Sequence, residues 1–137
     1  MVIVVYLVEQ WQTFHRRPML ESLAQQALGQ AIFLCINPPI SMRRVIFQLF
    51  RNAALLPAGS RRLSENLYLF TPVVWFPKLG RNGQEKDSKG WKMISRQIQN
   101  AINKIVPDSK QIISWIYRPE QISCLGLARE NLAVYEC

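Results

Sequence analysis

The stretch Val2–Val8 (VIVVYLV) decides the fold that this sequence predicts. It is a continuous apolar run rich in β-branched residues, which is typical of a strand buried on both faces of a parallel sheet. A second run of this kind is Ala31–Ile36 (AIFLCI). The residues between the two runs predict a helix that begins near Pro18 and stops at Gly29, with one apolar face made of Leu20, Leu23, Ala24, Ala27 and Leu28. Together they predict a βαβ unit with a right-handed crossover.

The rest of the chain continues this alternation. Apolar runs predict further strands at 66–71, 111–117 and 132–135, and we expect the last of them, LAVY, to be buried. Helical spacing predicts helices at 43–56, at 91–106 and, as a short one, at 119–129. Residues 81–90 (RNGQEKDSKG) are polar and predict an exposed loop. The sequence therefore predicts an α/β fold in one domain, 1–137, with a Rossmann-like parallel sheet of about five strands flanked by helices.

The composition is that of a globular protein. A hydrophobic fraction of 49% and a charged fraction of 19% exclude a disordered chain, and no run reaches the roughly 18 apolar residues that a membrane-spanning helix needs. The apolar start, Met1–Val8, lacks a basic region and a cleavage site, so we expect no signal peptide. Cys35, Cys124 and Cys137 form no CxxC pair, which indicates a reducing compartment and no disulfide framework or zinc site. We therefore expect a cytoplasmic protein without a metal or cofactor.

The net charge of +8 favours anionic partners, namely nucleotide phosphates, nucleic acid or an anionic lipid surface. The basic residues are spread over every segment and form no recognition motif, which argues against specific binding of nucleic acid. Ligands of parallel α/β sheets bind beyond the carboxyl ends of the strands, and the pairs Arg16-Arg17 and Arg43-Arg44 fall there. We place the pair Arg61-Arg62 at the opposite edge, just before a strand, where a solvated role is expected.

The loop after the first strand, EQWQTFHRR, carries residue types that bind phosphorylated sugars. We expect Trp11 to pack on a sugar and Arg16 and Arg17 to face anionic groups, because guanidinium groups bind phosphate at two points. The alternative is that Trp11 caps the sheet and the arginines are solvated. The loop lacks GxGxxG, so it predicts no dinucleotide site. His15 is the only histidine and thus the only candidate imidazole base, although a lone histidine is more often structural.

The end of the fourth expected strand, WIYRPEQ, offers a second group of candidates. We expect Tyr117 to pack on sugar and Arg118 to face an anionic group. Glu120 follows Pro119 and suits the positive end of a helix, so a structural role explains it. The sequence contains no Ser-His-Asp order, no P-loop and no paired-carboxylate signature.

Three segments resemble a known family when they are taken in order: W…HRRPMLESLAQQ…GQAIFLCINPP, ENLYLFTPVVWFP and IISWIYRPEQ…ENLAVYEC. They are similar to the N-terminal domain of bacterial glycosyltransferases of the two-domain GT-B type. More narrowly, they resemble the teichuronic acid and capsule polysaccharide group. The resemblance runs along nearly the whole chain, and the order and spacing of the motifs carry it. It implies the acceptor-side domain of an enzyme that moves a sugar from a nucleotide-sugar to a hydroxyl acceptor in cell-surface polysaccharide synthesis.

The resemblance also implies that the chain is incomplete. In that family a strand like VYEC is followed by more of the first domain and by a second Rossmann-like domain that holds most donor contacts. The implied partners are a nucleotide-sugar donor, a sugar or lipid-linked acceptor, a separately encoded C-terminal half and the anionic inner face of a membrane. We therefore expect this chain to be truncated, inactive alone and prone to self-association. The alternative is a non-catalytic Rossmann-like module that binds anions or a partner subunit.

Overall fold

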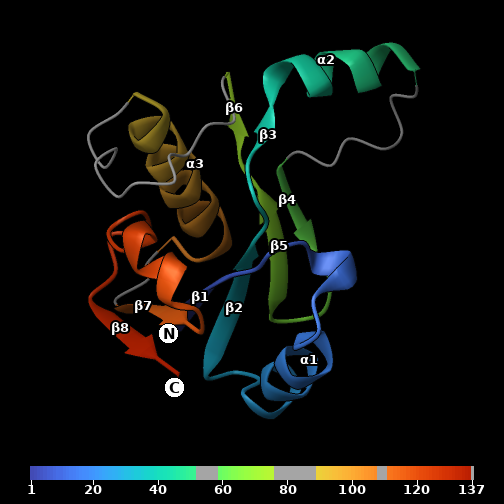
Figure 1. Ribbon diagram of the computed structural model, residues 1–137. Helices are drawn as coiled ribbons and strands as arrows, with labels where there is room; N and C mark the ends of the chain where they lie inside the picture. Colours follow the sequence, from blue (N-terminus) through green and yellow to red (C-terminus); the bar gives the residue numbers. More distant parts are fainter. Residues whose placement is uncertain (52–58, 76–88, 108–110, 137) are drawn as a thin grey trace.

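The computed structural model describes residues 1–51, 59–75, 89–107 and 111–136 (Figure 1). In these residues the main sheet has six strands in the spatial order β4-β5-β2-β1-β7-β8. They are β1 (Val2–Leu7), β2 (Ala31–Ile36), β4 (Gly59–Arg62), β5 (Leu67–Thr71), β7 (Gln111–Ile116) and β8 (Leu132–Tyr135). A separate short parallel pair joins β3 (Ile40–Ser41) to β6 (Val73–Val74). The strands expected from the apolar runs are confirmed, with ends shifted by at most one residue.

The main sheet is mixed rather than parallel throughout. Parallel pairs join β1 to β2, β1 to β7, β2 to β5 and β7 to β8, whereas β4 runs antiparallel to β5. In the turn between β4 and β5 the amides of Leu63 and Ser64 donate to the carbonyl of Leu67, at 2.8 and 3.2 Å. The expectation of a purely parallel sheet of about five strands is corrected here, because β4 adds a sixth, antiparallel strand. The sequence of β4 is GSRR and all its residues are exposed, so no apolar run marks this edge strand.

The described ranges contain the helices α1 (Arg17–Gln26), α2 (Met42–Arg51) and α3 (Lys89–Ile105) and the short 3-10 helices η1 (Trp11–Thr13) and η3 (Pro119–Cys124). The helices expected at 43–56 and 91–106 are confirmed, although 52–56 lies outside the described residues. Of the short helix expected at 119–129, only Pro119–Cys124 is helical, as the 3-10 helix η3, and 125–129 is not helical. Of the loop expected at 81–90, residues 81–88 lie outside the described ranges, and Lys89 and Gly90 begin α3. No helix in the described part of the chain has the length and apolar character needed to cross a membrane.

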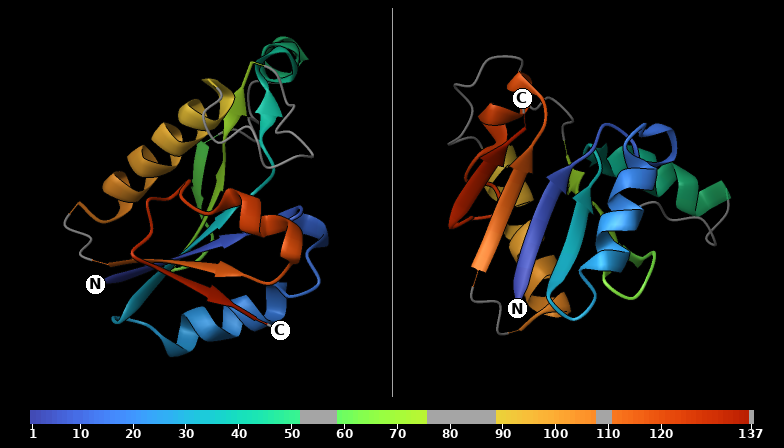
Figure 2. Two further views of the ribbon diagram at one scale, coloured as in Figure 1. Left: turned by 60° about the vertical axis from the view of Figure 1, so that its left-hand side comes forward. Right: turned by 90° about the horizontal axis from the view of Figure 1, so that it is seen from below.

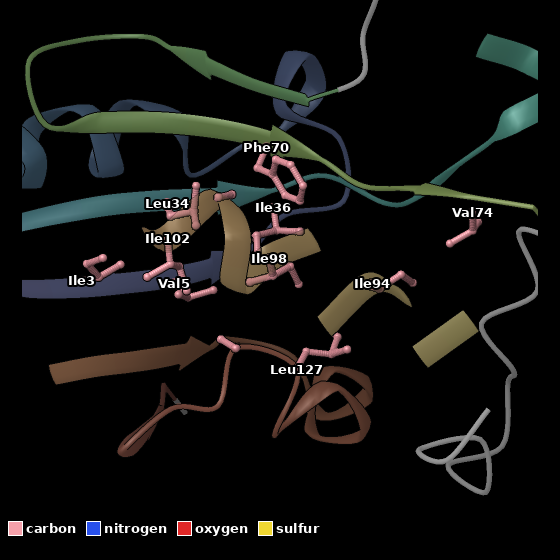
Figure 3. Packing of buried hydrophobic residues seen from close by; sticks show 12 residues of the cluster. Ile3, Val5, Leu34, Ile36, Phe70, Val74, Ile94, Ile98, Ile102 and Leu127 are labelled. Atoms are coloured by element: carbon pink, nitrogen blue, oxygen red, sulfur yellow. The ribbon is translucent and has the colours of Figure 1, made fainter. Parts of the chain in front are cut away.

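The alternating side chains of the central strand β1 explain its continuous apolar run. Ile3 and Val5 pack in one cluster with α3, while Val4 and Tyr6 pack in another with α1. Figure 2 shows α1 and α3 on opposite faces of the sheet. Figure 3 shows the α3 side, where isoleucines of the helix lie against residues of β1 and β2. A strand covered on both faces needs apolar side chains at every position, and that interpretation of Val2–Val8 is confirmed.

Two amide side chains join elements that are far apart in the sequence. Gln97 of α3 donates to the Val73 carbonyl at 2.7 Å and accepts from the Val73 amide at 2.9 Å. Asn66 donates to the carbonyls of Ala24 and Ala31, at 2.7 and 3.0 Å. Buried backbone groups need such partners where no strand supplies them. These side chains therefore fix β6 against α3 and the start of β5 against α1 and β2.

The last strand, β8, differs from its expectation. It pairs with β7, but all four of its residues are exposed. The expectation of a buried strand is corrected, because β8 lies at the edge of the sheet and no helix of the described residues packs over it.

Candidate functional site

A hollow of about 540 Å³ lies at the carboxyl ends of β1, β2 and β5. Because these strands are parallel, the segments that follow them meet at one edge of the sheet. The residues that line this hollow are Glu9, Gln10, Trp11, Gln12, Asn37, Pro38, Pro39, Ile40, Arg44, Gly59, Ser60, Arg61, Leu69 and Thr71.

Asn37 ties the wall of the hollow together. Its Oδ1 accepts a hydrogen bond from the backbone amide of Trp11 at 3.0 Å, and its Nδ2 donates to Oγ1 of Thr71 at 3.0 Å. The amide of Asn37 itself donates to the Phe70 carbonyl at 2.9 Å. One side chain thus links the loop after β1, the end of β2 and the end of β5. Trp11 is held with only 5% of its surface exposed, so this part of the wall is fixed before any ligand binds.

Two arginines reach the hollow from different elements. Arg44 belongs to the first turn of α2, where its amide donates to the hydroxyl of Ser41 at 3.3 Å, a contact typical of a helix N-cap. Arg61 comes from β4. Both side chains are exposed, and neither pairs with a carboxylate of the described residues. The hollow therefore has two guanidinium groups that are open to an anionic ligand.

The position of Arg61 corrects the sequence-based placement of the Arg61-Arg62 pair at the opposite edge. Because β4 is antiparallel, Gly59 pairs with Thr71 and the start of β4 lies at the carboxyl ends of the other strands. Arg61 consequently lines the hollow. Arg62 does not line it; it donates to the carbonyls of Ser64 and Glu65, at 3.0 and 2.8 Å.

Other candidates from the sequence gather at the neighbouring ends of β1 and β7. Arg16 pairs with Glu136, with 2.5 Å between Nη1 and Oε2, and its guanidinium carbon lies 5.2 Å from the centre of the Tyr117 ring. Arg118 pairs with Glu9 and lies 5.7 Å from the same ring centre. We call these five residues, together with Tyr6, the arginine–tyrosine cluster. Glu9 belongs to both regions, since it also lines the hollow.

Two stacked tyrosines form the base of the cluster. The rings of Tyr6 and Tyr117 are 5.3 Å apart at an angle of 13°. Burial raises the pKa of Tyr6 to about 12, with the neighbouring Arg16 opposing the shift. Burial also raises the pKa of Tyr117, and the charge of Glu9 adds to that effect. Both hydroxyls are therefore protonated and uncharged at neutral pH.

Gln121 fixes the backbone around this cluster. Its Oε1 accepts from the amides of Tyr117 and Arg118, at 3.1 and 3.3 Å, and its Nε2 donates to the carbonyl of Leu7 at 3.0 Å. The ends of β1 and β7 are thus joined by one side chain, as Asn37 joins β1, β2 and β5. Sequence reasoning selected neither amide, although Asn37 directly follows the buried strand β2 and Gln121 lies in η3, shortly after β7.

The remaining two candidates lie on the outside of the loop after β1. His15 is exposed, and its ring centre is 5.5 Å from that of Phe14 and 6.4 Å from that of Tyr117. Arg17 pairs with Glu21 at 2.8 Å, one helical turn along α1. Of the six candidates only Trp11 lines the hollow, so substrate contact by the other five stays a prediction. Within the described residues no three His, Cys, Asp or Glu side chains form a group able to hold a metal ion.

Comparison of the chain with protein families, with curated proteins and with solved structures finds no match. The resemblance to glycosyltransferases therefore stays a prediction from the sequence. What the fold adds is the geometry of the hollow and of the arginine–tyrosine cluster, side by side at one edge of the sheet.

Proposed function

We propose that this chain is the acceptor-side domain of a GT-B type glycosyltransferase and that the hollow binds a phosphorylated sugar or nucleotide. The observation that carries the proposal is the pair of open guanidinium groups, Arg44 and Arg61, at the hollow. Guanidinium groups bind phosphate oxygens at two points. The hollow thus offers the contacts that the phosphate of such a ligand needs, while the buried Trp11 fixes its wall.

The topology supports a Rossmann-like assignment within this proposal. The five strands that run parallel have the spatial order β5-β2-β1-β7-β8. In chain order they are the third, second, first, fourth and fifth parallel strands, which is the order of a doubly wound nucleotide-binding sheet. Ligands of such sheets bind beyond the carboxyl ends, near the point where the order reverses. Here the order reverses between β1 and β7, where the arginine–tyrosine cluster lies, and the loop after β1 supplies residues to both the cluster and the hollow.

The chemistry of the intact enzyme divides into parts that this chain does and does not supply. Sugar transfer needs a base to take the proton of the acceptor hydroxyl and positive charge to stabilise the departing diphosphate. Arg44 and Arg61 supply positive charge. Glu9 is the carboxylate among the residues that line the hollow, but it is engaged in an ion pair with Arg118 and is therefore a poor base. His15 does not line the hollow. The proposal therefore gives this chain a binding role, with the donor held mainly by a C-terminal partner half.

The same observation favours one alternative, a non-catalytic module that binds anions for a partner subunit. Such a module needs the open arginines and needs no base. The two candidate functions share the ligand site and differ in whether sugar transfer appears when a C-terminal donor domain is added. In both, we place the protein in the cytoplasm, in keeping with a sequence whose three cysteines form no CxxC pair.

Calorimetric titration with uridine diphosphate tests the shared site. We expect saturable binding, and we expect the double variant Arg44→Ala/Arg61→Ala to bind at least about tenfold more weakly, because each charge-assisted hydrogen bond contributes about 1.5–3 kcal/mol. The matched control, Lys92→Ala/Arg96→Ala, removes two exposed cations from α3 and leaves the hollow unchanged. Equal losses in the two variants would mean that binding is plain electrostatics. Addition of a C-terminal donor half then separates the two functions, since only a glycosyltransferase domain would restore transfer of a labelled sugar.

A further inference from the structure

Helix α2 exposes most of its apolar surface. Its exposed apolar residues are Ile46, Phe47, Leu49 and Phe50, and Phe50 has 88% of its surface exposed. Only Val45 of this helix is buried. The spacing of three and four residues places the exposed side chains on one side of the helix. In Figures 1 and 2, α2 extends from its start near β3 away from the sheet, in keeping with this exposure.

The charges of α2 are all positive. Its sequence, MRRVIFQLFR, contains Arg43, Arg44 and Arg51 and no Asp or Glu. All three arginines are exposed, and the guanidinium carbon of Arg51 lies 4.7 Å from the centre of the Phe47 ring. The aromatic side chains are therefore bordered by cations. A basic helix with an aromatic apolar side is the pattern of helices that lie in the interface of an anionic bilayer.

A third aromatic ring lies beside the start of α2. β6 pairs in parallel with β3, so that Val74 is opposite Ser41, the residue before α2. Trp75 follows Val74 and has 55% of its surface exposed. Tryptophan is favoured at the boundary between headgroups and acyl chains, where its ring meets apolar and polar surroundings at once. The exposed apolar residues of α2 and Trp75 are called the patch, and it extends from the helix to the end of β6.

We infer that α2 binds the surface of an anionic membrane, with Phe47 and Phe50 in the acyl boundary and Arg43 and Arg51 at the lipid headgroups. Charge complementarity selects this occupant, because an anionic bilayer offers apolar depth and negative charge together. The inference does not rest on the proposed function. Arg43 and Arg51 do not line the hollow, so ligand binding and membrane binding can be changed separately. The position of Arg44, on α2 and in the hollow, would bring the hollow close to the bilayer.

Flotation of the protein with vesicles tests this inference. We expect the chain to float with vesicles of phosphatidylcholine and phosphatidylglycerol. It should not float with vesicles of phosphatidylcholine alone. It should also not float at high salt, which screens exposed charges. The variant Phe47→Ser/Phe50→Ser should bind these vesicles at least about tenfold more weakly, because it loses the apolar surface that would be buried in the bilayer. The variant Arg43→Gln/Arg51→Gln should bind at least about tenfold more weakly, from two headgroup contacts.

Two control variants are matched to these changes. Leu28→Ser/Ile122→Ser alters two exposed apolar residues elsewhere, and Lys92→Gln/Arg96→Gln removes two exposed cations from α3. Both should float like the unchanged chain, and circular dichroism should show that all variants fold. Equal losses in the control variants, or no binding to either vesicle, would overturn the inference. So would self-association that Phe47→Ser/Phe50→Ser abolishes in a chain that ignores vesicles, because the patch would then belong to a second copy.

Discussion

The hollow and the arginine–tyrosine cluster lie at the same edge of the sheet and both combine arginines with an aromatic residue, yet their charges are placed differently. In the cluster, Arg16 pairs with Glu136 and Arg118 with Glu9. In the hollow, Arg44 and Arg61 pair with no carboxylate of the described residues. A paired arginine holds the protein together, and an incoming anion has to compete with its carboxylate. An open arginine is ready for a ligand.

The two regions are therefore expected to respond differently to mutation. Changes in the hollow should alter ligand affinity, and changes in the cluster should alter stability.

The largest effect is expected from Arg61→Glu. It removes a charge-assisted contact and places a negative charge in the hollow, so affinity for uridine diphosphate should fall by more than about tenfold. Arg16→Ala should leave that affinity within about twofold, because Arg16 is engaged by Glu136. Titration calorimetry of both variants gives the comparison. A greater loss of affinity for Arg16→Ala than for Arg61→Glu would indicate that the ligand binds in the cluster, as the sequence alone suggested.

Asn37→Ala should lower the free energy of unfolding by about 1–3 kcal/mol, because it leaves the Trp11 amide and the Thr71 hydroxyl without their partner. Asn100→Ala, at an exposed position of α3, is the matched control and should change stability by less than about 0.5 kcal/mol. Urea denaturation measures both. If the two variants unfold alike, Asn37 does not hold the wall of the hollow.

Arg16→Ala is expected to lower the free energy of unfolding by about 1 kcal/mol. Its side chain is 28% exposed and that of Glu136 is 35% exposed, so solvent screens the pair only in part. A double-mutant cycle with Glu136→Gln isolates the interaction. A coupling energy near zero would show that the pair contributes little and that Arg16 is open to a ligand after all.

The smallest effect is expected for Arg17→Ala. Arg17 and Glu21 are one helical turn apart, and their side chains are 47% and 46% exposed. Such a pair contributes about 0.3–0.5 kcal/mol and loses it in salt. Thermal unfolding at low and high ionic strength should show a small difference that disappears with salt. A large, salt-independent loss would indicate a structural role through the ring of Trp11, which lies 5.4 Å from the Arg17 guanidinium carbon.

The sequence predicts the parts of this molecule that depend on local pattern. The apolar runs locate β1 and β2, and the rule that ligands bind beyond parallel strands leads to the loop after β1. Helical spacing also predicts both α2 and α3. Helical spacing does not predict how much of each helix is buried. α3 buries residues that include Ile94, Ile98 and Ile102, whereas α2 buries Val45 alone. This difference depends on which other parts of the chain pack against each helix.

The features that the sequence did not predict depend on contacts between distant residues. β4 is a polar edge strand, and only its pairing with β5 brings Arg61 into the hollow. The partner of Arg16 lies 120 positions further along the chain, at Glu136. Asn37 and Gln121 act through backbone groups of other strands. Residue type and spacing carry no signal for such pairings, so the sequence could not indicate which arginines are open. The edge of the sheet that it selected for the ligand stays a prediction.

A nitrogen–hydrogen correlation spectrum recorded during titration with uridine diphosphate locates the ligand, because it reports which amide groups respond to it. We expect the amide signals of Trp11, Asn37 and Arg61 to shift with the ligand, while those of Tyr117 and Glu136 stay in place. Shifts confined to Tyr117, Arg118 and Glu136 would contradict binding in the hollow and would place the ligand site in the arginine–tyrosine cluster.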